Sequence, residues 1–542
     1  METIYNEIEK VWSTPDLDIE HRGLGEAILR NLKEDNQDRI FEVFYDKRIA
    51  LKVGDVRQQT IKVAQNLQRI GLKKGDTVVI YSMLNEKITP ISFGCFTIGA
   101  PVNYFETHFE GDDINEFLEK IDPVLIVFEE TYRSALFTAI SNSNLPNLKH
   151  ILSLDSVSPS IEEVLFQDCG SIDTFEVPKI ENPTRHPALL LLTSGTTRLP
   201  KIMALSHAVM MEGIYSWWNI EAGMKIFPAS PVRWISQASL LLQPAFFDVQ
   251  RVYTSQIPSG ELGRDIIDTY KITHFVSAPA NYPPILKAAE LSGNPESLSS
   301  LKIAAVGGEV VSKVFIDIMS KALPKCRPIK CYGMTEFGGL AATDQDIDKK
   351  GVNGGALKKG FMTKIVDENQ NSLGPNERGQ LLMKRISLPY LKYWKNDKAN
   401  EENFVEGGWL KTGDYAYMDS DNLLNIVGRC KDLLRSGGNI IVPVSIETVL
   451  GSHPNVQLCA LIGHPNSDGS NDKIGTIFVA LRRSADSEKI EDDLRNLLEA
   501  KCTREEVQVV RHIKVLSEMP LTTCGKINRA ILAEMAQSSK NN

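Results

Sequence analysis

The sequence lacks the features that mark membrane, secreted and metal-cluster proteins. Its purely apolar runs, such as Ala188–Leu192, are far shorter than a membrane helix requires. The first residues carry acids and no apolar core, so they do not resemble a secretory signal. The eight cysteines are scattered without a C-x-x-C pair, and no His–Cys cluster completes a metal site. We therefore expect a reduced, cytoplasmic protein without a transmembrane segment.

An excess of positive charge is also missing. The net charge is −9, which argues against a bulk electrostatic grip on nucleic acid. No repeat or low-complexity tract interrupts the chain. With 42% hydrophobic and 24% charged residues, the composition is that of a globular protein, and 542 residues predict at least two domains.

What the sequence does contain is a series of short apolar runs separated by helix-like segments. This pattern predicts an α/β fold in which helices cover both faces of parallel-rich sheets. Ligands of such sheets collect in the loops that follow the strands. The expected strands are Thr77–Ser82, Pro123–Phe128, Ala188–Leu192, Thr273–Val276 and Leu301–Val306.

A domain boundary is expected near residue 430. The residues 419–422 read DSDN, which indicates a hairpin turn between two strand-like runs. The following segment has the length of a small domain with its own helices and strands. We therefore predict a large domain over 1–429 and a small α+β domain over 431–542.

The strongest local signal directly follows the apolar run Ala188–Leu192. Residues 193–201 read TSGTTRLPK, a loop whose hydroxyls and backbone can approach phosphate oxygens. It does not match the G-x-x-x-x-G-K-[ST] loop of nucleoside triphosphatases. A polar surface turn is the alternative. The candidate phosphate-binding residues are Thr193, Ser194, Gly195, Thr196, Thr197 and Lys201.

Four weaker signals follow along the chain. In YGMTE, Tyr332 can stack on a base, Thr335 can donate to a phosphate and Glu336 can hold Mg²⁺, although a glutamate here also suits a helix start. Asp414, in GWLKTGD, can accept hydrogen bonds from ribose hydroxyls but also suits a turn. The last two signals are the runs GRCKDLLRSGGN at 428–439 and TTCGK at 522–526.

Taken together in this order and spacing, these motifs resemble the adenylate-forming superfamily. It contains acyl-CoA synthetases, 4-coumarate–CoA ligases, beetle luciferases and peptide-synthetase adenylation domains. The resemblance spans nearly the whole chain. It implies an acid–CoA ligase that uses ATP and Mg²⁺ to adenylate a small-molecule carboxylic acid and then transfers the acyl group to coenzyme A. A medium- or long-chain fatty acid is the leading substrate, with a 4-coumarate-like aromatic acid as the alternative.

The resemblance also implies roles for individual residues. Catalytic roles fall to Lys526, which would bridge the acid and the α-phosphate, and to Thr335 and Glu336, with Glu336 as the metal ligand. The adenine would lie among Gly308, Glu309, Tyr332 and Gly333, and Asp414 and Arg429 would hold the ribose. Lys431 would be the hinge between the domains. The acyl and CoA pocket would be formed by Trp234, Phe337, Gly338, Gly339, Gly437 and Gly438.

Two positions depart from the family pattern. Arg198 and Ile202 stand in the phosphate loop where the family usually has glycine. If either position requires a left-handed backbone, a side chain there costs about 1–2 kcal/mol. The departures motivate a second hypothesis, a non-catalytic nucleotide- or acyl-binding relative. Retention of Glu336, Asp414 and Lys526 argues against it.

Two further expectations concern single features. His207 follows the phosphate loop and is expected to be structural. Many relatives are peroxisomal through a C-terminal S-K-L sequence, whereas this sequence ends in SSKNN.

Overall fold

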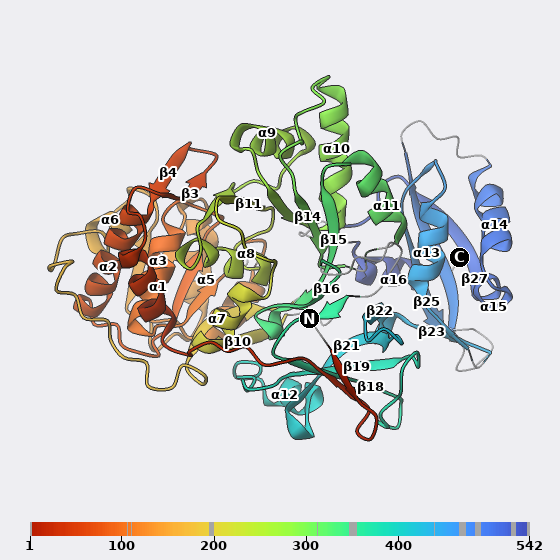
Figure 1. Cartoon of the computed structure of the whole chain (residues 1–542), viewed down its shortest axis with the longest axis horizontal. Helices are drawn as coiled ribbons and strands as arrows, with labels where there is room; N and C mark the ends of the chain where they lie inside the picture. Colours follow the sequence, from red (N-terminus) through yellow and green to blue (C-terminus); the bar gives the residue numbers. More distant parts are fainter. Residues whose placement is uncertain are drawn as a thin grey trace.

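Five sheets and the helices around them make up the fold (Figure 1). The structure is a computed structural model. It describes residues 3–105, 107–109, 111–193, 200–309, 311, 313–345, 355–437, 439–465, 473–482, 489–521 and 527–538.

The first sheet has six strands in the order β10-β9-β6-β5-β7-β8. Its centre is parallel, because β5 pairs in parallel with both β6 and β7, while β10 folds back antiparallel on β9. The parallel centre reads as continuous apolar sequence because both faces are covered. The strands are β5 (Val78–Tyr81), β6 (Val102–Tyr104), β7 (Leu125–Phe128), β8 (His150–Ser153), β9 (Pro187–Leu192) and β10 (Ile202–Ser206).

The second sheet has nine strands in the order β17-β16-β15-β14-β13-β11-β12-β3-β4. Strands β15, β14, β13, β11, β12 and β3 run parallel to one another, and antiparallel strands close both edges. The strands are β3 (Ile40–Phe44), β4 (Ile49–Lys52), β11 (Met224–Pro228), β12 (Val249–Tyr253), β13 (His274–Ser277), β14 (Ile303–Gly307), β15 (Arg327–Met334), β16 (Gly339–Thr343) and β17 (Ala356–Leu357).

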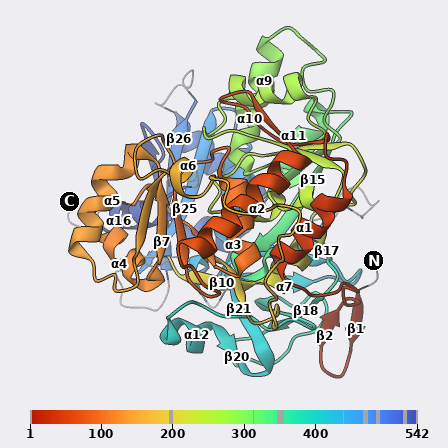
Figure 2. The same ribbon diagram turned by 90° about the vertical axis from the view of Figure 1, so that its left-hand side faces the viewer.

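Helices cover both of these sheets. Figure 2 shows α1 (Leu24–Glu34), α2 (Val53–Arg69) and α3 (Ile88–Ile98) side by side. All residues of α3 are buried, as expected for an apolar helix in the interior, and it ends at Gly99 in the left-handed conformation. The other face of the first sheet packs on α4 (Asp112–Ile121) and α5 (Arg133–Asn142). That of the second sheet packs on α9 (Gly260–Tyr270), α10 (Tyr282–Leu291) and α11 (Lys313–Ala322).

The third sheet is antiparallel and lies beside the first two (Figure 1). The turn expected at residues 419–422 does join two of its strands, β21 and β22, in a hairpin. The strands are β1 (Ile4–Asn6), β2 (Val11–Ser13), β18 (Phe361–Val366), β19 (Gly379–Arg385), β20 (Phe404–Val405), β21 (Trp409–Met418) and β22 (Leu424–Arg429), with α12 (Asp397–Asn403) before β20.

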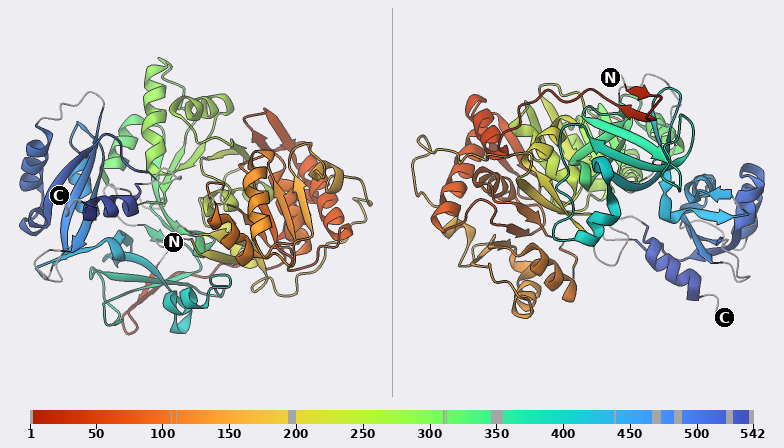
Figure 3. Two further views of the ribbon diagram at one scale, coloured as in Figure 1. Left: turned by 180° about the vertical axis from the view of Figure 1, so that it is seen from behind. Right: turned by 90° about the horizontal axis from the view of Figure 1, so that it is seen from below.

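A smaller domain follows β22 and has hydrophobic clusters of its own (Figure 3). Its three-stranded sheet is β25-β26-β27, preceded by a two-stranded hairpin. The elements are β23 (Leu434–Ser436), β24 (Asn439–Ile441), α13 (Pro443–Gly451), β25 (Val456–Pro465), β26 (Lys473–Leu481), α14 (Ile490–Lys501), α15 (Arg504–Val509), β27 (Val510–Leu516) and α16 (Arg529–Ser538). The predicted α/β class, with a large N-terminal and a small C-terminal domain, is confirmed.

Among the described helices, none combines the length and the apolar character that crossing a bilayer requires.

Candidate nucleotide-binding site

The predicted phosphate loop joins two paired strands of the first sheet. Thr193 is buried, and its backbone N–H donates to the carbonyl of Lys201 at 2.8 Å, which closes the base of the loop. The antiparallel β9–β10 pair therefore fixes where the loop starts and ends. The predicted residues Ser194, Gly195, Thr196 and Thr197, and with them Arg198, lie outside the described residues.

Tyr332, Asp414 and Arg429 converge from the second and third sheets. The Tyr332 hydroxyl donates to Asp414 Oδ2 at 2.6 Å, and Arg429 Nε lies 3.2 Å from Asp414 Oδ1. The strand pairing explains the second contact, because Asp414 in β21 and Arg429 in β22 are direct cross-strand partners. A third hydrogen bond ties Arg429 Nη1 to the carbonyl of Thr412 at 3.2 Å. A carboxylate held in this way can receive a pair of ligand hydroxyls.

Glu336 lies in a one-turn 3₁₀ helix, Thr335–Phe337, at the end of β15. Its Oε1 accepts a hydrogen bond of 2.8 Å from the Tyr393 hydroxyl, and both side chains are buried. The ammonium of Lys201 lies 4.9 Å from the centre of the Tyr393 ring, within cation–π range. Tyr393 therefore links the lysine of the phosphate loop to the carboxylate of Glu336.

Both carboxyl groups of the site are costly to ionise without a bound cation. Burial raises the pKa of Glu336, against the opposing effects of Tyr393, Arg429 and Lys201. Burial also raises the pKa of Asp414, against Arg429 and Tyr332. Because Arg429 acts on both carboxyls, the two halves of the site belong to one cluster. We call Lys201, Tyr332, Glu336, Tyr393, Asp414 and Arg429 the central cluster.

A buried ion pair between Arg385 and Glu212 lies next to the central cluster and holds the backbone beside Glu336. Arg385 Nη1 pairs with Glu212, while Arg385 Nη2 donates to the carbonyl of Phe337, the residue after Glu336. His21 Nε2 lies 3.0 Å from the other oxygen of Glu212. Glu212 and Arg385 are 2% and 4% exposed, so the pair is shielded from solvent. These residues come from an N-terminal segment, from α7 (His207–Tyr215) and from β19, and they fix the backbone beside Glu336.

Helix α7 also packs directly against the loop that follows Glu336. A Cβ added at Gly213 would lie 2.1 Å from the carbonyl oxygen of Gly338, so only glycine fits there. Gly338 has φ +71°, which glycine adopts without strain. Ser216 Oγ accepts from the N–H of Leu340 at 3.0 Å. Since α7 directly follows β10, it connects the phosphate loop mechanically to the loop of Glu336.

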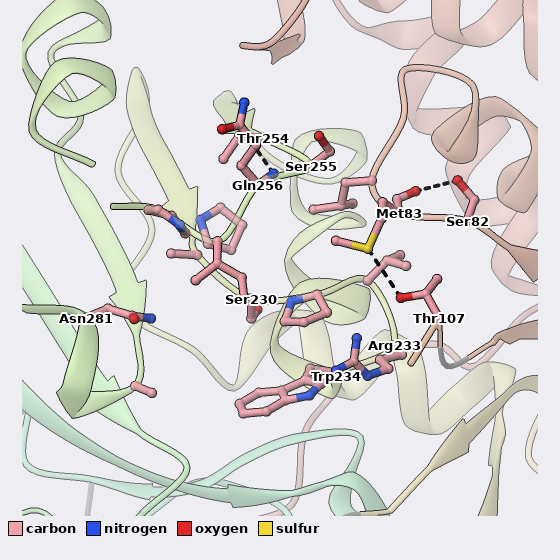
Figure 4. A pocket seen from close by; sticks show the side chains of 18 of the residues that line it. Ser82, Met83, Thr107, Ser230, Arg233, Trp234, Thr254, Ser255, Gln256 and Asn281 are labelled. Carbon is pink, nitrogen blue, oxygen red and sulfur yellow. Dashed lines mark hydrogen bonds between the residues drawn. The ribbon is translucent and has the colours of Figure 1, made fainter. Parts of the chain in front are cut away.

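A separate pocket lies at the carboxyl ends of β5, β6, β11, β12 and β13. We call it the Trp234 pocket (Figure 4). Its volume is about 90 Å³, and its lining is mostly apolar with several hydroxyls and amides. One wall is held by Asp46, whose carboxylate accepts from Thr254 at 2.6 Å and from the Ser255 hydroxyl at 2.7 Å. The opposite wall contains Met83, whose sulfur lies 3.4 Å from the Thr107 hydroxyl.

The structure places the residues that were predicted to form the acyl and CoA pocket in different surroundings. Trp234 lines the Trp234 pocket. Phe337, by contrast, is fully buried against Phe361, at a centroid distance of 5.5 Å, and Gly338 and Gly339 contact α7. These three residues are not among the lining of the Trp234 pocket. Their assignment to the acyl and CoA site stays a prediction.

The other predicted residues lie on several different elements. Gly308, with φ +87°, and Glu309 follow β14, and Gly333 lies in β15. Lys431 lies in the short link between β22 and β23, where burial lowers its pKa. Gly437, with φ +56°, turns the β23–β24 hairpin.

The predicted catalytic lysine is not described. Both Lys526 and Gly438 lie outside the described residues. Arg529, which begins α16, is described. Burial opposes its charge, yet the carboxylates of Glu447, Asp432 and Glu309 raise its pKa. The small domain therefore places Arg529 within electrostatic reach of Glu309.

The two remaining expectations are resolved by local structure. Ile202 lies in β10, paired with Leu192, and is not among the residues with positive φ, so the condition under which it would be strained is not met. His207 is fully buried, and its Nδ1 accepts from the N–H of Leu24 at 3.0 Å. Burial lowers its pKa to about 3, which fits a structural, neutral imidazole.

Sequence reasoning missed Tyr393, Glu212 and Arg385. None belongs to a motif with a recognisable spacing. The available signal was the single charge of Glu212 within an apolar stretch, since such a charge is rarely buried without a partner.

Two family models match the chain. One, described as AMP-binding enzyme, matches residues 30–390, and the other, AMP-binding enzyme C-terminal domain, matches residues 445–526. A 4-coumarate–CoA ligase of Humulus lupulus is 25% identical over 505 residues, which cover 88% of this chain and 87% of the relative. An acetyl-coenzyme A synthetase of Streptomyces coelicolor is 24% identical over 544 residues, which cover 94% and 82%.

Solved structures show the same fold. An anthranilate CoA ligase in complex with anthranoyl-AMP matches with a TM-score of 0.86 at 21% identity, covering 97% of this chain and 99% of that one. A benzoate CoA ligase from Burkholderia xenovorans matches with a TM-score of 0.82 at 18% identity, covering 94% and 99%. The match of the first family model to most of the chain decides the assignment: the protein is an enzyme of the AMP-binding family.

Proposed function

We propose that the protein is an acid–CoA ligase. It would adenylate a carboxylic acid with ATP, release pyrophosphate, and transfer the acyl group from the adenylate to coenzyme A. The observation that carries this proposal is the central cluster, in which a hydroxyl-binding carboxylate, Asp414, lies in one charge network with Glu336 and Lys201. The first suits a ribose and the other two suit the triphosphate end of the same nucleotide.

Different residues of the site would bind different parts of the nucleotide. Asp414 would accept hydrogen bonds from the ribose hydroxyls, with Arg429 and Tyr332 fixing its orientation. Lys201 would neutralise charge on the phosphates, and Thr335 would donate to the α-phosphate. Such prearranged charges stabilise the charge that develops at phosphorus and cost no reorganisation during the reaction.

A magnesium ion fits the donor set of this site. Mg²⁺ is usually bound by one or two carboxylates together with substrate phosphates, so the single buried carboxylate of Glu336 is sufficient on the protein side. Within the described residues there is no group of three or more His, Cys, Asp or Glu that would form an all-protein cage. When bound, Mg²⁺ would neutralise phosphate charge, and Glu336, held by Tyr393, would position it.

The Trp234 pocket would receive the acid. Its volume of about 90 Å³ is smaller than the cavity of about 150 Å³ that is known to hold benzene. A medium- or long-chain acid would therefore need the pocket to widen, whereas a short or compact aromatic acid needs little change. The relatives named for 4-coumarate, acetate, anthranilate and benzoate support the same direction. We propose a compact acid and place the fatty acid second.

The two half-reactions would use two orientations of the small domain. Lys431, in the link after β22, would act as the hinge between domains 1–429 and 431–542. Lys526 would serve adenylation, and Gly437 and Gly438 would approach the thiol arm of CoA after rotation. Removing one group and presenting another in this way is a familiar use of hinge motion.

The test is acid-dependent release of pyrophosphate from Mg-ATP, with and without CoA. The panel runs from acetate to oleate and includes benzoate, anthranilate and 4-coumarate. Release that a compact acid induces and that CoA accelerates supports the full proposal. Acceleration with oleate alone would contradict the substrate class, and release that CoA does not affect would contradict thioester formation.

A further inference from the structure

A second pocket lies on the far side of the aromatic residues that flank Glu336. Its volume is about 500 Å³, and we call it the basic pocket. Tyr390 and Phe404 line it, and their rings pack at a centroid distance of 5.5 Å. Phe404 also packs on Tyr393, whose hydroxyl holds Glu336. The basic pocket is therefore separated from the central cluster by one layer of aromatic side chains.

Three of the four cations that line the basic pocket form no ion pair with a carboxylate of the described residues. Arg185, Lys384 and Lys392 line it together with Arg385, and no acidic residue contributes to the lining. Arg185 lies just before β9, Lys384 in β19 and Lys392 in the segment after it, so two segments that are far apart in the sequence bring positive charge to one place. In the described part of the chain none of these three forms an ion pair. The chain as a whole carries −9, so the cluster does not reflect a basic composition.

Neutral contacts hold two of the cations in place. Lys384 Nζ lies 4.8 Å from the Trp409 ring and 3.4 Å from the carbonyl of Gly407. Lys392 Nζ lies 5.9 Å from the Phe404 ring. Aromatic rings and a carbonyl orient an ammonium group but do not neutralise it, so its donors remain suited to an oxyanion.

Arg385 forms the buried base of this pocket. It is 4% exposed, and its Nε has no hydrogen-bond partner among the described residues. Its other nitrogens hold Glu212 and the carbonyl of Phe337. A charge bound in the pocket would thus lie next to the side chain that fixes the backbone of the Glu336 loop.

We propose that the basic pocket binds a multiply charged phosphate compound at a site distinct from the phosphate loop. A phosphate monoester carries about −1.5 to −2 at pH 7, so three unpaired cations beside Arg385 match more than one phosphate group. The volume leaves room for such a ligand. This site does not depend on the proposed ligase activity.

The test is isothermal titration of the full-length protein with inorganic pyrophosphate at low ionic strength. The pocket variant is Arg185→Gln/Lys392→Gln. The matched control is Lys395→Gln/Lys398→Gln, which removes the same charge from neighbouring residues outside the lining. All three proteins are also prepared with Lys201→Gln, which weakens any binding at the phosphate loop.

In the Lys201→Gln background the otherwise unchanged protein should still bind pyrophosphate. The pocket variant should bind at least about tenfold more weakly, and the control should stay within about twofold, as expected when contacts rather than net charge hold the ligand. Three results would overturn the proposal: equal binding by the pocket variant, equal weakening in the control, or loss of all binding on Lys201→Gln alone.

Discussion

Replacing Tyr393 with phenylalanine tests whether the central cluster works as a unit. The substitution removes one buried hydrogen bond to Glu336, of 2.8 Å, and keeps the ring beneath Lys201. A hydrogen bond to a charged group contributes about 1.5–3 kcal/mol. At about 1.36 kcal/mol for each factor of ten, kcat/KM for Mg-ATP should fall by about tenfold to about a hundredfold.

The pH profile should change in a defined direction. Burial raises the pKa of Glu336, and the Tyr393 hydrogen bond opposes that rise. As pH falls through this raised pKa, Glu336 is protonated and loses its affinity for a cation. Without the hydroxyl the pKa rises further, so the acid limb of activity should move to higher pH.

The assay is acid-dependent exchange of pyrophosphate into ATP, measured against both pH and magnesium concentration. Tyr390→Phe is the matched control, because this neighbouring hydroxyl contacts the carbonyl of Met383 at 3.5 Å and not Glu336. A Tyr393→Phe enzyme with kcat/KM within about twofold of the wild type and an unmoved acid limb would refute the positioning role of Tyr393.

Three further substitutions test the support of the site and the proposed catalytic lysine. Arg385→Gln leaves Glu212 buried without its arginine partner, so calorimetry should show a free energy of unfolding that is lower by about 3–5 kcal/mol. The double variant Glu212→Gln/Arg385→Gln should partly restore this stability, and no recovery would argue against a coupled pair. Gly213→Ala places a methyl group 2.1 Å from the carbonyl oxygen of Gly338. We expect a large fall in the rate of adenylation, measured by pyrophosphate exchange, and a smaller loss of thermal stability. An unchanged exchange rate would show that the loop after Glu336 can shift freely. Lys526→Ala should abolish adenylation while thioester formation from supplied acyl-AMP persists, and equal loss in both assays would remove Lys526 from its proposed role.

Motifs predicted most of the central cluster because each motif lies in a strand or directly next to one. Tyr332 and Glu336 come at the end of β15, and Lys201 directly precedes β10. Asp414 and Arg429 lie on the two strands of the hairpin whose turn was predicted from DSDN, and antiparallel pairing then brings them together. The position of a motif next to its own strand and the residues that form a tight turn are local properties, so the sequence carries this information directly.

The residues that sequence reasoning missed depend on contacts between distant segments. Glu212 and Arg385 are 173 residues apart, and only the packing of α7 against β19 makes them partners. The family resemblance gave no sign that the ring of Phe337 packs on Phe361 in the third sheet. At Ile202 the family comparison suggested a strained turn, whereas pairing with Leu192 makes it an ordinary strand residue.

The buried carboxyls also predict how ligand binding and pH act together. Burial raises the pKa values of Glu336 and Asp414 above those of unfolded carboxyls, so the ligand-free protein binds more protons folded than unfolded. The stability that these two groups contribute is fully present at low pH and is lost as pH rises through their folded pKa values. Mg-ATP binds the ionised forms and removes that cost, so its stabilising effect should grow with pH.

Thermal unfolding with and without Mg-ATP at pH 5.5 and pH 8 measures this difference. Under Asp414→Asn the pH dependence of the gain should shrink, because one of the two groups no longer titrates. An equal gain at both pH values in the wild type would mean that these carboxyls are not where the nucleotide and its cation bind.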